Sequence, residues 1–202
     1  MNQNIINFYM AASKLKSVIR TGWKEVGIPD DKIETVAEHV YGSMILALAI
    51  SSEYNYKSLD LLKVFKMLII KELTKINNEV SILSKEEETD KNQIIKDITH
   101  GLSNQDEILK LYDEAVALES NEAKFVLNIT KLESDIQAKQ YELEGEFTLD
   151  NAKKDIENYP EELRAEIKDK VVNASDGWIL YNRKYYDNDE VFMNLSKDIQ
   201  KM

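Results

Sequence analysis

The scarcity of chain breakers is the feature that most constrains the fold of this sequence. Its 202 residues include six glycines and two prolines, whereas strands joined by turns need many more of both. Hydrophobic residues make up 43% and charged residues 31% of the chain, which is the balance of a globular protein rather than a disordered one. The sequence therefore predicts an all-α fold, and a chain of this length can bury a sizeable core.

Helical periodicity supports this prediction along the chain. Apolar residues recur at helical spacing over 36–49, directly after a capping box made by Thr35 and Glu38. The segment 61–73 is apolar almost all round near 67–70, which is typical of a central buried helix. Gly145 is expected to end a long helix that starts near residue 121. The remaining helices are predicted over 5–19, 108–118, 149–159, 162–172, 178–186 and 189–202, and the polar stretch 85–92 is interpreted as a solvated loop or helix start.

Composition excludes several classes of function. The chain has no cysteine, so it cannot hold a disulfide, a thiol nucleophile or a zinc–thiolate site. Its only histidines are His39 and His100, too few for a site built from several imidazoles. A formal charge of -11 argues against binding a nucleic-acid polymer, which requires a basic face. No apolar run is long enough to cross a membrane and no secretory signal is evident, so a cytoplasmic location is expected.

Four local motifs follow one another over about residues 12–143. They are Leu15 to Trp23 with Arg20, the run E-T-V-A-E-H over 34–39, the run L-I-I-K-E-L-T-K-I over 68–76, and the segment 122–142 with T-K-L-E over 130–133. In this order they resemble the HD-domain phosphohydrolases, in particular the branch of 5'-deoxynucleotidases. That branch reads E-[ST]-V-A-[DE]-H, L-x-H-D-x-x-E-x and D-K-L-E at the last three motifs.

The resemblance implies a helical bundle of the HD type. We expect a single domain over 1–202, with an HD core over 1–145 and a C-terminal helical extension over 146–202. The resemblance also implies a homodimer, and a nucleotide or another phosphate-type anion as ligand. Family members use one divalent metal ion such as manganese, cobalt or magnesium, held by four side chains in the pattern H…HD…D.

The metal motif of the family is degenerate in this chain. His39 matches the first ligand, whereas Lys71 and Glu72 stand at the HD pair and Thr130 stands at the last aspartate. A charged lysine has no lone pair for a metal, and a threonine offers only a neutral hydroxyl. Lys75 replaces an acidic residue that follows the pair. The sequence therefore predicts a catalytically inactive relative without a metal cofactor, retained as a binding or assembly module.

Two other functions stay open. The chain is alternatively an active phosphohydrolase whose rearranged metal site uses His39, Glu72 and a carboxylate such as Glu79 or Glu38. In the family comparison, Asn78 and Glu79 stand where a Gly-Asp pair usually follows the metal motif, with one residue fewer between. A purely structural dimer module is the third function.

Individual residues also allow two interpretations. Lys71 replaces the charge of the missing ion by pairing with Glu72 or Glu38, or it is an ordinary polar residue at a helix end. Arg20, Trp23 and Glu34 match the substrate side of the family site, where arginine can fork onto a phosphate. Alternatively Arg20 bridges helices and Trp23 fills the core. His39 is either a metal ligand or a hydrogen-bonded core histidine.

Overall fold

The computed structural model describes residues 2–56, 58–77 and 91–202. Every element within these ranges is a helix, which confirms the predicted all-α fold, and an isolated antiparallel bridge joins Ile19 to Thr35. Asn78, Glu79 and the charge run over 85–88 lie outside the described residues. Among the described residues, no helix is long and apolar enough to span a membrane. The chain divides into two compact units, and each is described separately.

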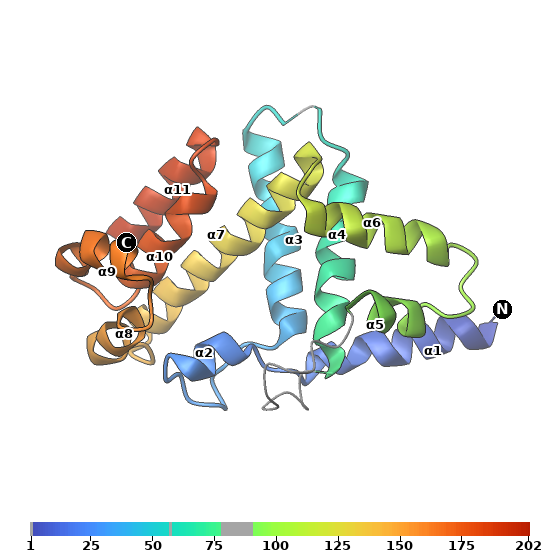
Figure 1. Cartoon of the computed structure of the whole chain (residues 1–202), viewed down its shortest axis with the longest axis horizontal. Coiled ribbons are helices and arrows are strands. Elements are labelled where there is room, and N and C mark those ends of the chain that lie inside the picture. The colour runs from blue at the N-terminus through green and yellow to red at the C-terminus, as the bar shows by residue number, and fades with distance from the viewer. Residues whose placement is uncertain (1, 57, 78–90) are drawn as a thin grey trace. The chain divides into compact units, whose positions relative to one another are not determined.

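The first unit comprises Met1–Ile19 and Thr35–Leu127. Helix α4 packs against both α3 and α6, and α5 packs against α1 and α6 (Figure 1). The helices of this unit are α1 (Asn2–Ala12), η1 (Ser13–Lys16), α3 (Val36–Glu53), α4 (Leu61–Glu72), η2 (Leu73–Asn77), α5 (Lys91–Ile98), α6 (Gln105–Ala117) and the beginning of α7 (Asn121–Leu143).

Helix α3 begins at the predicted capping box. The hydroxyl of Thr35 accepts a hydrogen bond from the backbone N–H of Glu38 at 3.2 Å, and the Glu38 carboxylate accepts one from the backbone N–H of Thr35 at 2.6 Å. Two backbone donors of the first turn are thereby satisfied. Glu38 is exposed and committed to this cap, which leaves it poorly suited as a metal ligand.

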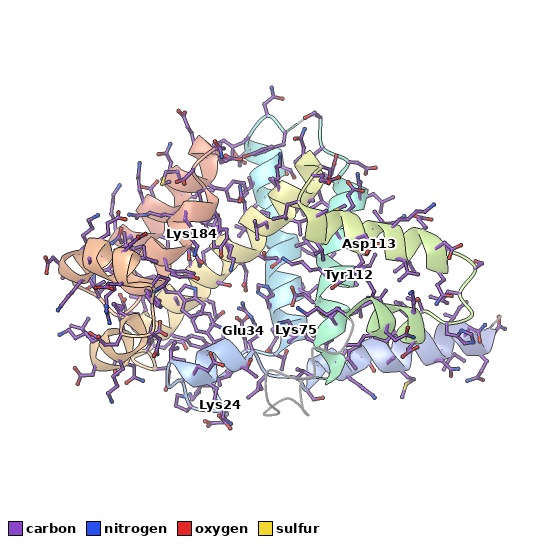
Figure 2. The ribbon with its side chains drawn as sticks, viewed as in Figure 1. Lys24, Glu34, Lys75, Tyr112, Asp113 and Lys184 are labelled. Carbon is purple, nitrogen blue, oxygen red and sulfur yellow. The ribbon has the colours of Figure 1, made fainter. Side chains whose placement is uncertain are left out.

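The core of the first unit is built around α4 and α6. Val64, Met67 and Leu68 of α4 are at most 1% exposed, whereas Ile69 is 40% exposed, so α4 is buried on a broad face rather than all round. Tyr112 of α6, labelled in Figure 2, is 6% exposed. The buried cluster consists of Leu15, Val18, Val36, Ile70, Leu73, Ile76, Ile95, Ile108 and Tyr112.

The second unit comprises Arg20–Glu34 and Asn128–Met202. Gly145 ends α7 as predicted: its φ is +79°, its N–H donates to Glu142 at 3.0 Å, and the N–H of Glu146 donates to Tyr141 at 2.9 Å. Helix α10 packs against α8, α9 and α11. Besides the remainder of α7, the helices are α2 (Thr21–Glu25), α8 (Leu149–Ile156), α9 (Glu161–Ile167), η3 (Lys168–Lys170), α10 (Asp176–Asn182), η4 (Arg183–Tyr185) and α11 (Glu190–Lys201).

Candidate functional site

Arg20 lies at the centre of a buried polar cluster in the second unit and contacts three of its side chains. Its Nη1 forms a salt bridge with Glu34 Oε1 and lies 3.7 Å from Glu133 Oε2. Its Nη2 donates to Ser134 Oγ at 2.9 Å. Arg20 directly precedes α2, whereas Glu133 and Ser134 lie on α7. A guanidinium presents its donors in a fixed planar fork, so one side chain can hold groups from distant parts of the sequence.

Glu34 is fixed by both its backbone and its side chain. Its carbonyl accepts the backbone N–H of Arg20 at 3.1 Å, and its own N–H donates to the Tyr141 hydroxyl at 2.8 Å. Its Oε1 also accepts the indole N–H of Trp23 at 2.8 Å. With the salt bridge to Arg20, these bonds hold an 8% exposed carboxylate in one orientation. Such fixed geometry is what a ligand or catalytic carboxylate needs.

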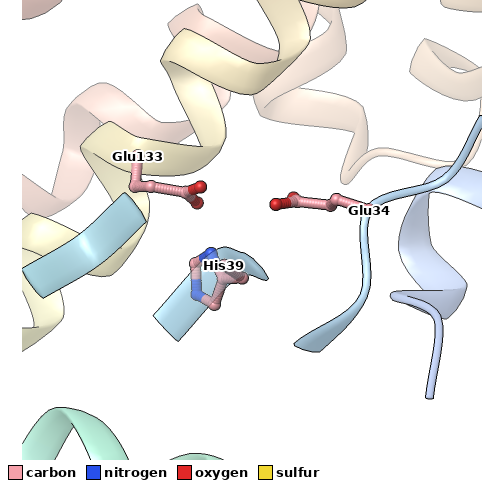
Figure 3. A group of neighbouring side chains, drawn as sticks. All are labelled: Glu34, His39 and Glu133. Atoms are coloured by element: carbon pink, nitrogen blue, oxygen red, sulfur yellow. The ribbon is translucent and has the colours of Figure 1, made fainter. Parts of the chain in front are cut away.

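A second buried carboxylate lies close to the first. Glu34 and Glu133 each offer an oxygen, and these atoms lie within 4.8 Å of one another. Figure 3 shows the two carboxylates pointing toward each other. Glu133 is also 8% exposed. Two buried carboxylates this close repel each other when ionised, so a shared cation stabilises the pair. Arg20 contributes part of that positive charge.

The aromatic residues Tyr141 and Trp23 both contact Glu34 and pack against each other. Their rings meet edge to face, with centroids 5.2 Å apart at 79°. Burial raises the pKa of Tyr141 to about 12, so the phenol stays protonated near neutral pH. It therefore keeps donating to the carbonyl of Lys32 at 3.2 Å while accepting the N–H of Glu34.

The other predicted site residues lie in different elements. His39, in the first turn of α3, is 3% exposed, and its backbone N–H donates to Thr35 at 3.1 Å. Thr130, on α7 in the second unit, is buried, and its carbonyl accepts the Ser134 hydroxyl at 3.0 Å. Lys71 and Glu72 are the half-buried last residues of α4.

Within residues 2–56, 58–77 and 91–202, Lys71 makes no ion pair of the kind that the counter-ion interpretation requires. No salt bridge joins it to Glu72 or Glu38 in the part of the chain that the structure describes. Burial lowers the pKa of Lys71, and the nearby negative charge of Glu72 opposes this shift only in part. Its environment therefore disfavours the ammonium form.

Sequence reasoning missed Glu133, Ser134 and Tyr141 as partners of the site. The signal for Glu133 was present, because it matches the glutamate of the family motif D-K-L-E even though Thr130 departs from the aspartate. Tyr141 lies in the motif segment 122–142 but had no assigned role, and Ser134 carries no such signal. Their contacts with Glu34 and Arg20 join residues more than 100 positions apart.

Comparisons with known proteins agree with the motifs. The profile of the HD domain family matches residues 12–168. A 5'-deoxynucleotidase HDDC2 from Dictyostelium discoideum is 30% identical over 151 residues, which cover 69% of this chain and 78% of that protein.

Solved structures support the same fold. A conserved hypothetical protein from Pyrococcus furiosus has a TM-score of 0.66 at 22% identity, covering 98% of this chain and 99% of its own. A protein from Pyrococcus horikoshii has a TM-score of 0.60 at 27% identity, with the same coverage. The profile match spans well over half of the residues. The chain therefore belongs to the HD domain family of hydrolases and resembles its 5'-deoxynucleotidases.

Proposed function

We propose that this chain is a divalent-metal-dependent phosphohydrolase with a rearranged ligand set, acting on nucleoside 5'-monophosphates. The observation that carries the proposal is the pair of buried carboxylates of Glu34 and Glu133, whose oxygens lie within 4.8 Å of one another. The substrate class is taken from the 5'-deoxynucleotidase named among the relatives. This is the active alternative that the sequence left open, with a different choice of carboxylates.

The donor set suits such an ion. Carboxylate oxygens together with an imidazole nitrogen bind hard and borderline divalent cations such as manganese and magnesium. We assign the imidazole to His39, which the family resemblance names as a ligand and which is separated from Glu34 only by the capping segment 35–38. Glu34 directly precedes Thr35, the N-cap residue of α3, and His39 lies in the first turn of that helix. The two donors are therefore close in the sequence.

The chemistry that a divalent ion supplies to phosphate esters is Lewis-acid polarisation of the phosphoryl group. The chain's own residues have other tasks. Arg20 offsets the charge of both carboxylates and sets their spacing. Trp23 and Tyr141 fix the orientation of Glu34 by donating to its side chain and accepting from its backbone. Their rings also exclude water from that side of the carboxylate, which strengthens its electrostatic interactions.

An inactive binding module is the second candidate. Lys71 and Thr130 favour it, because neither can serve as a family ligand near neutral pH. In that case Arg20 is the permanent cation of the two carboxylates and no metal is required. The homodimer and the cytoplasmic location remain proposals that rest on the family resemblance. Sedimentation of the purified chain tests the first of these.

A hydrolysis assay on deoxynucleoside 5'-monophosphates separates the two candidates. The active proposal predicts phosphate release with manganese or cobalt, its loss after chelation, and its loss in Glu133→Gln. The matched control is Glu144→Gln, an exposed glutamate just beyond the end of α7. Absence of metal-dependent release from the wild-type chain across this substrate series favours the inactive module.

A further inference from the structure

Both tryptophans of the chain meet in one stack. Trp23 and Trp178 are its only two tryptophans, and their rings lie 4.4 Å apart between centroids at 26°. Trp23 belongs to α2, whereas Trp178 lies on α10, beyond the residues that match the family profile. Trp23 is 1% exposed. Trp178 Nε1 is buried and has no hydrogen-bond partner among the described residues, so stacking rather than a polar contact governs where this ring lies.

Trp23 links the stack directly to the carboxylate cluster. Its indole N–H donates a hydrogen bond to Glu34 Oε1 at 2.8 Å. The Arg20 guanidinium carbon lies 5.6 Å from the centroid of the Trp23 ring, within the range of a cation–π interaction. Any rotation of Trp23 would therefore disturb both members of the Arg20–Glu34 salt bridge.

Helix α10 is anchored at both ends to α7. At its start, the backbone N–H and the hydroxyl of Ser175 both donate to Glu142 at 2.7 Å. At its end, Asn182 Nδ2 donates to Asp135 at 2.7 Å. Asp135 follows Glu133 and Ser134 on α7. Because these anchors lie in the second unit on the helix that carries Glu133, Trp178 is held in a fixed place against Trp23.

We propose that Trp178 is a positioning residue for the site. Its ring holds Trp23 in the orientation in which the indole N–H fixes Glu34, so the C-terminal helices determine the geometry of the carboxylate pair. The consequence for ion and substrate affinity rests on the proposed function, whereas the effect on Trp23 and Glu34 does not. Residues that hydrogen-bond a metal ligand typically contribute about 10- to 100-fold in affinity. Trp23 is such a partner of Glu34, and we expect the loss of its orientation in Trp178→Leu to cost up to this range.

The test compares Trp178→Leu and Trp178→Phe with the wild-type chain. Phenylalanine retains a stacked ring, whereas leucine fills part of the space without one. Tyr181→Leu is the matched control, because Tyr181 lies on the same helix and its ring contacts Tyr159 instead. Proton–nitrogen NMR of the indole groups gives one resonance for each tryptophan, and Glu34→Gln provides the reference shift of Trp23 with a weakened acceptor.

We expect the Trp23 indole resonance to move toward the Glu34→Gln position and to exchange faster with solvent in Trp178→Leu. It should stay near its wild-type position in Trp178→Phe and in Tyr181→Leu. Manganese titration should give binding weaker by roughly 10- to 100-fold in the leucine variant alone.

A folded Trp178→Leu chain with an unchanged Trp23 resonance overturns the proposal. If the leucine variant does not fold, the phenylalanine variant provides the test. A shifted Trp23 resonance in Trp178→Phe, which retains a stacked ring, also contradicts the proposed role of that ring. If the wild-type chain binds no manganese, the proposed function fails, while the indole resonance still decides whether Trp178 positions Glu34.

Discussion

Asp135 accepts a hydrogen bond from the hydroxyl of Tyr186 at 2.9 Å in the second unit. The carboxyl group is 0% exposed, and burial raises its pKa from 3.8 to about 8. The bonds from Asn182 and Tyr186 and the charges of Arg183 and Lys131 oppose this shift without cancelling it. The folded chain therefore holds a proton on Asp135 over a pH range in which the unfolded chain has released it.

The stability of the protein should fall as the pH rises because of this group. Its folded pKa lies above the unfolded value, so its contribution is fully present below pH 3.8 and is lost as the pH passes about 8. One group contributes a slope of at most about 1.4 kcal/mol per pH unit to the free energy of unfolding. Asp135→Asn, which mimics the protonated form, should flatten this slope in urea unfolding between pH 5 and pH 8.

The exposed Asp113 of α6, labelled in Figure 2, supplies the control variant Asp113→Asn. It should leave the pH slope as in the wild-type chain. A slope that Asp135→Asn does not change would mean that Asp135 is ionised in the folded protein at neutral pH.

Replacing Lys71 should not destabilise the fold. Burial lowers the pKa of Lys71, which means that desolvation makes its ammonium charge costly to keep in the folded chain. Methionine has nearly the same length and no charge, and Lys71→Met should leave the melting temperature at pH 7 unchanged or raise it. Lys75→Met, at an exposed position one turn later, is the control. A clear loss of stability in Lys71→Met alone would restore the counter-ion interpretation.

The capping box of α3 offers a prediction about local stability. Thr35→Ala removes the acceptor for the backbone N–H of Glu38 and should lower the free energy of unfolding by about 1 kcal/mol. Thr35→Ser keeps a hydroxyl and should recover most of this loss in the same urea titration. Equal stability of the alanine and wild-type chains would show that the cap contributes nothing to the start of α3.

Local signals predicted much of the fold from the sequence. The Thr35–Glu38 capping box and Gly145 mark a helix start and a helix end where the structure has them, because both signals act over a few residues. Helix α2 was missed, because its five residues cannot display a periodicity. Helix α5 was foreseen only as a possible helix start within the polar stretch 85–92.

The site was harder to predict because it depends on long-range contacts. Arg20, Trp23 and Glu34 were identified as one group by their motifs, and the structure brings them into contact. The approach of Glu133 to Arg20 is a property of the folded chain that no spacing within the sequence reveals. The roles of His39, Lys71, Glu72 and Thr130 stay predictions.

The amount of metal bound by the purified chain decides whether Glu133 and His39 hold a divalent ion. The purified chain is dialysed against manganese, freed of excess ion and analysed for bound metal, in parallel with Glu133→Gln, His39→Gln and the control Glu144→Gln. We expect about one ion per chain in the wild type and in the control, and far less in the other two variants. Far less than one ion per wild-type chain, or full occupancy without Glu133 and His39, would contradict the proposed metal site.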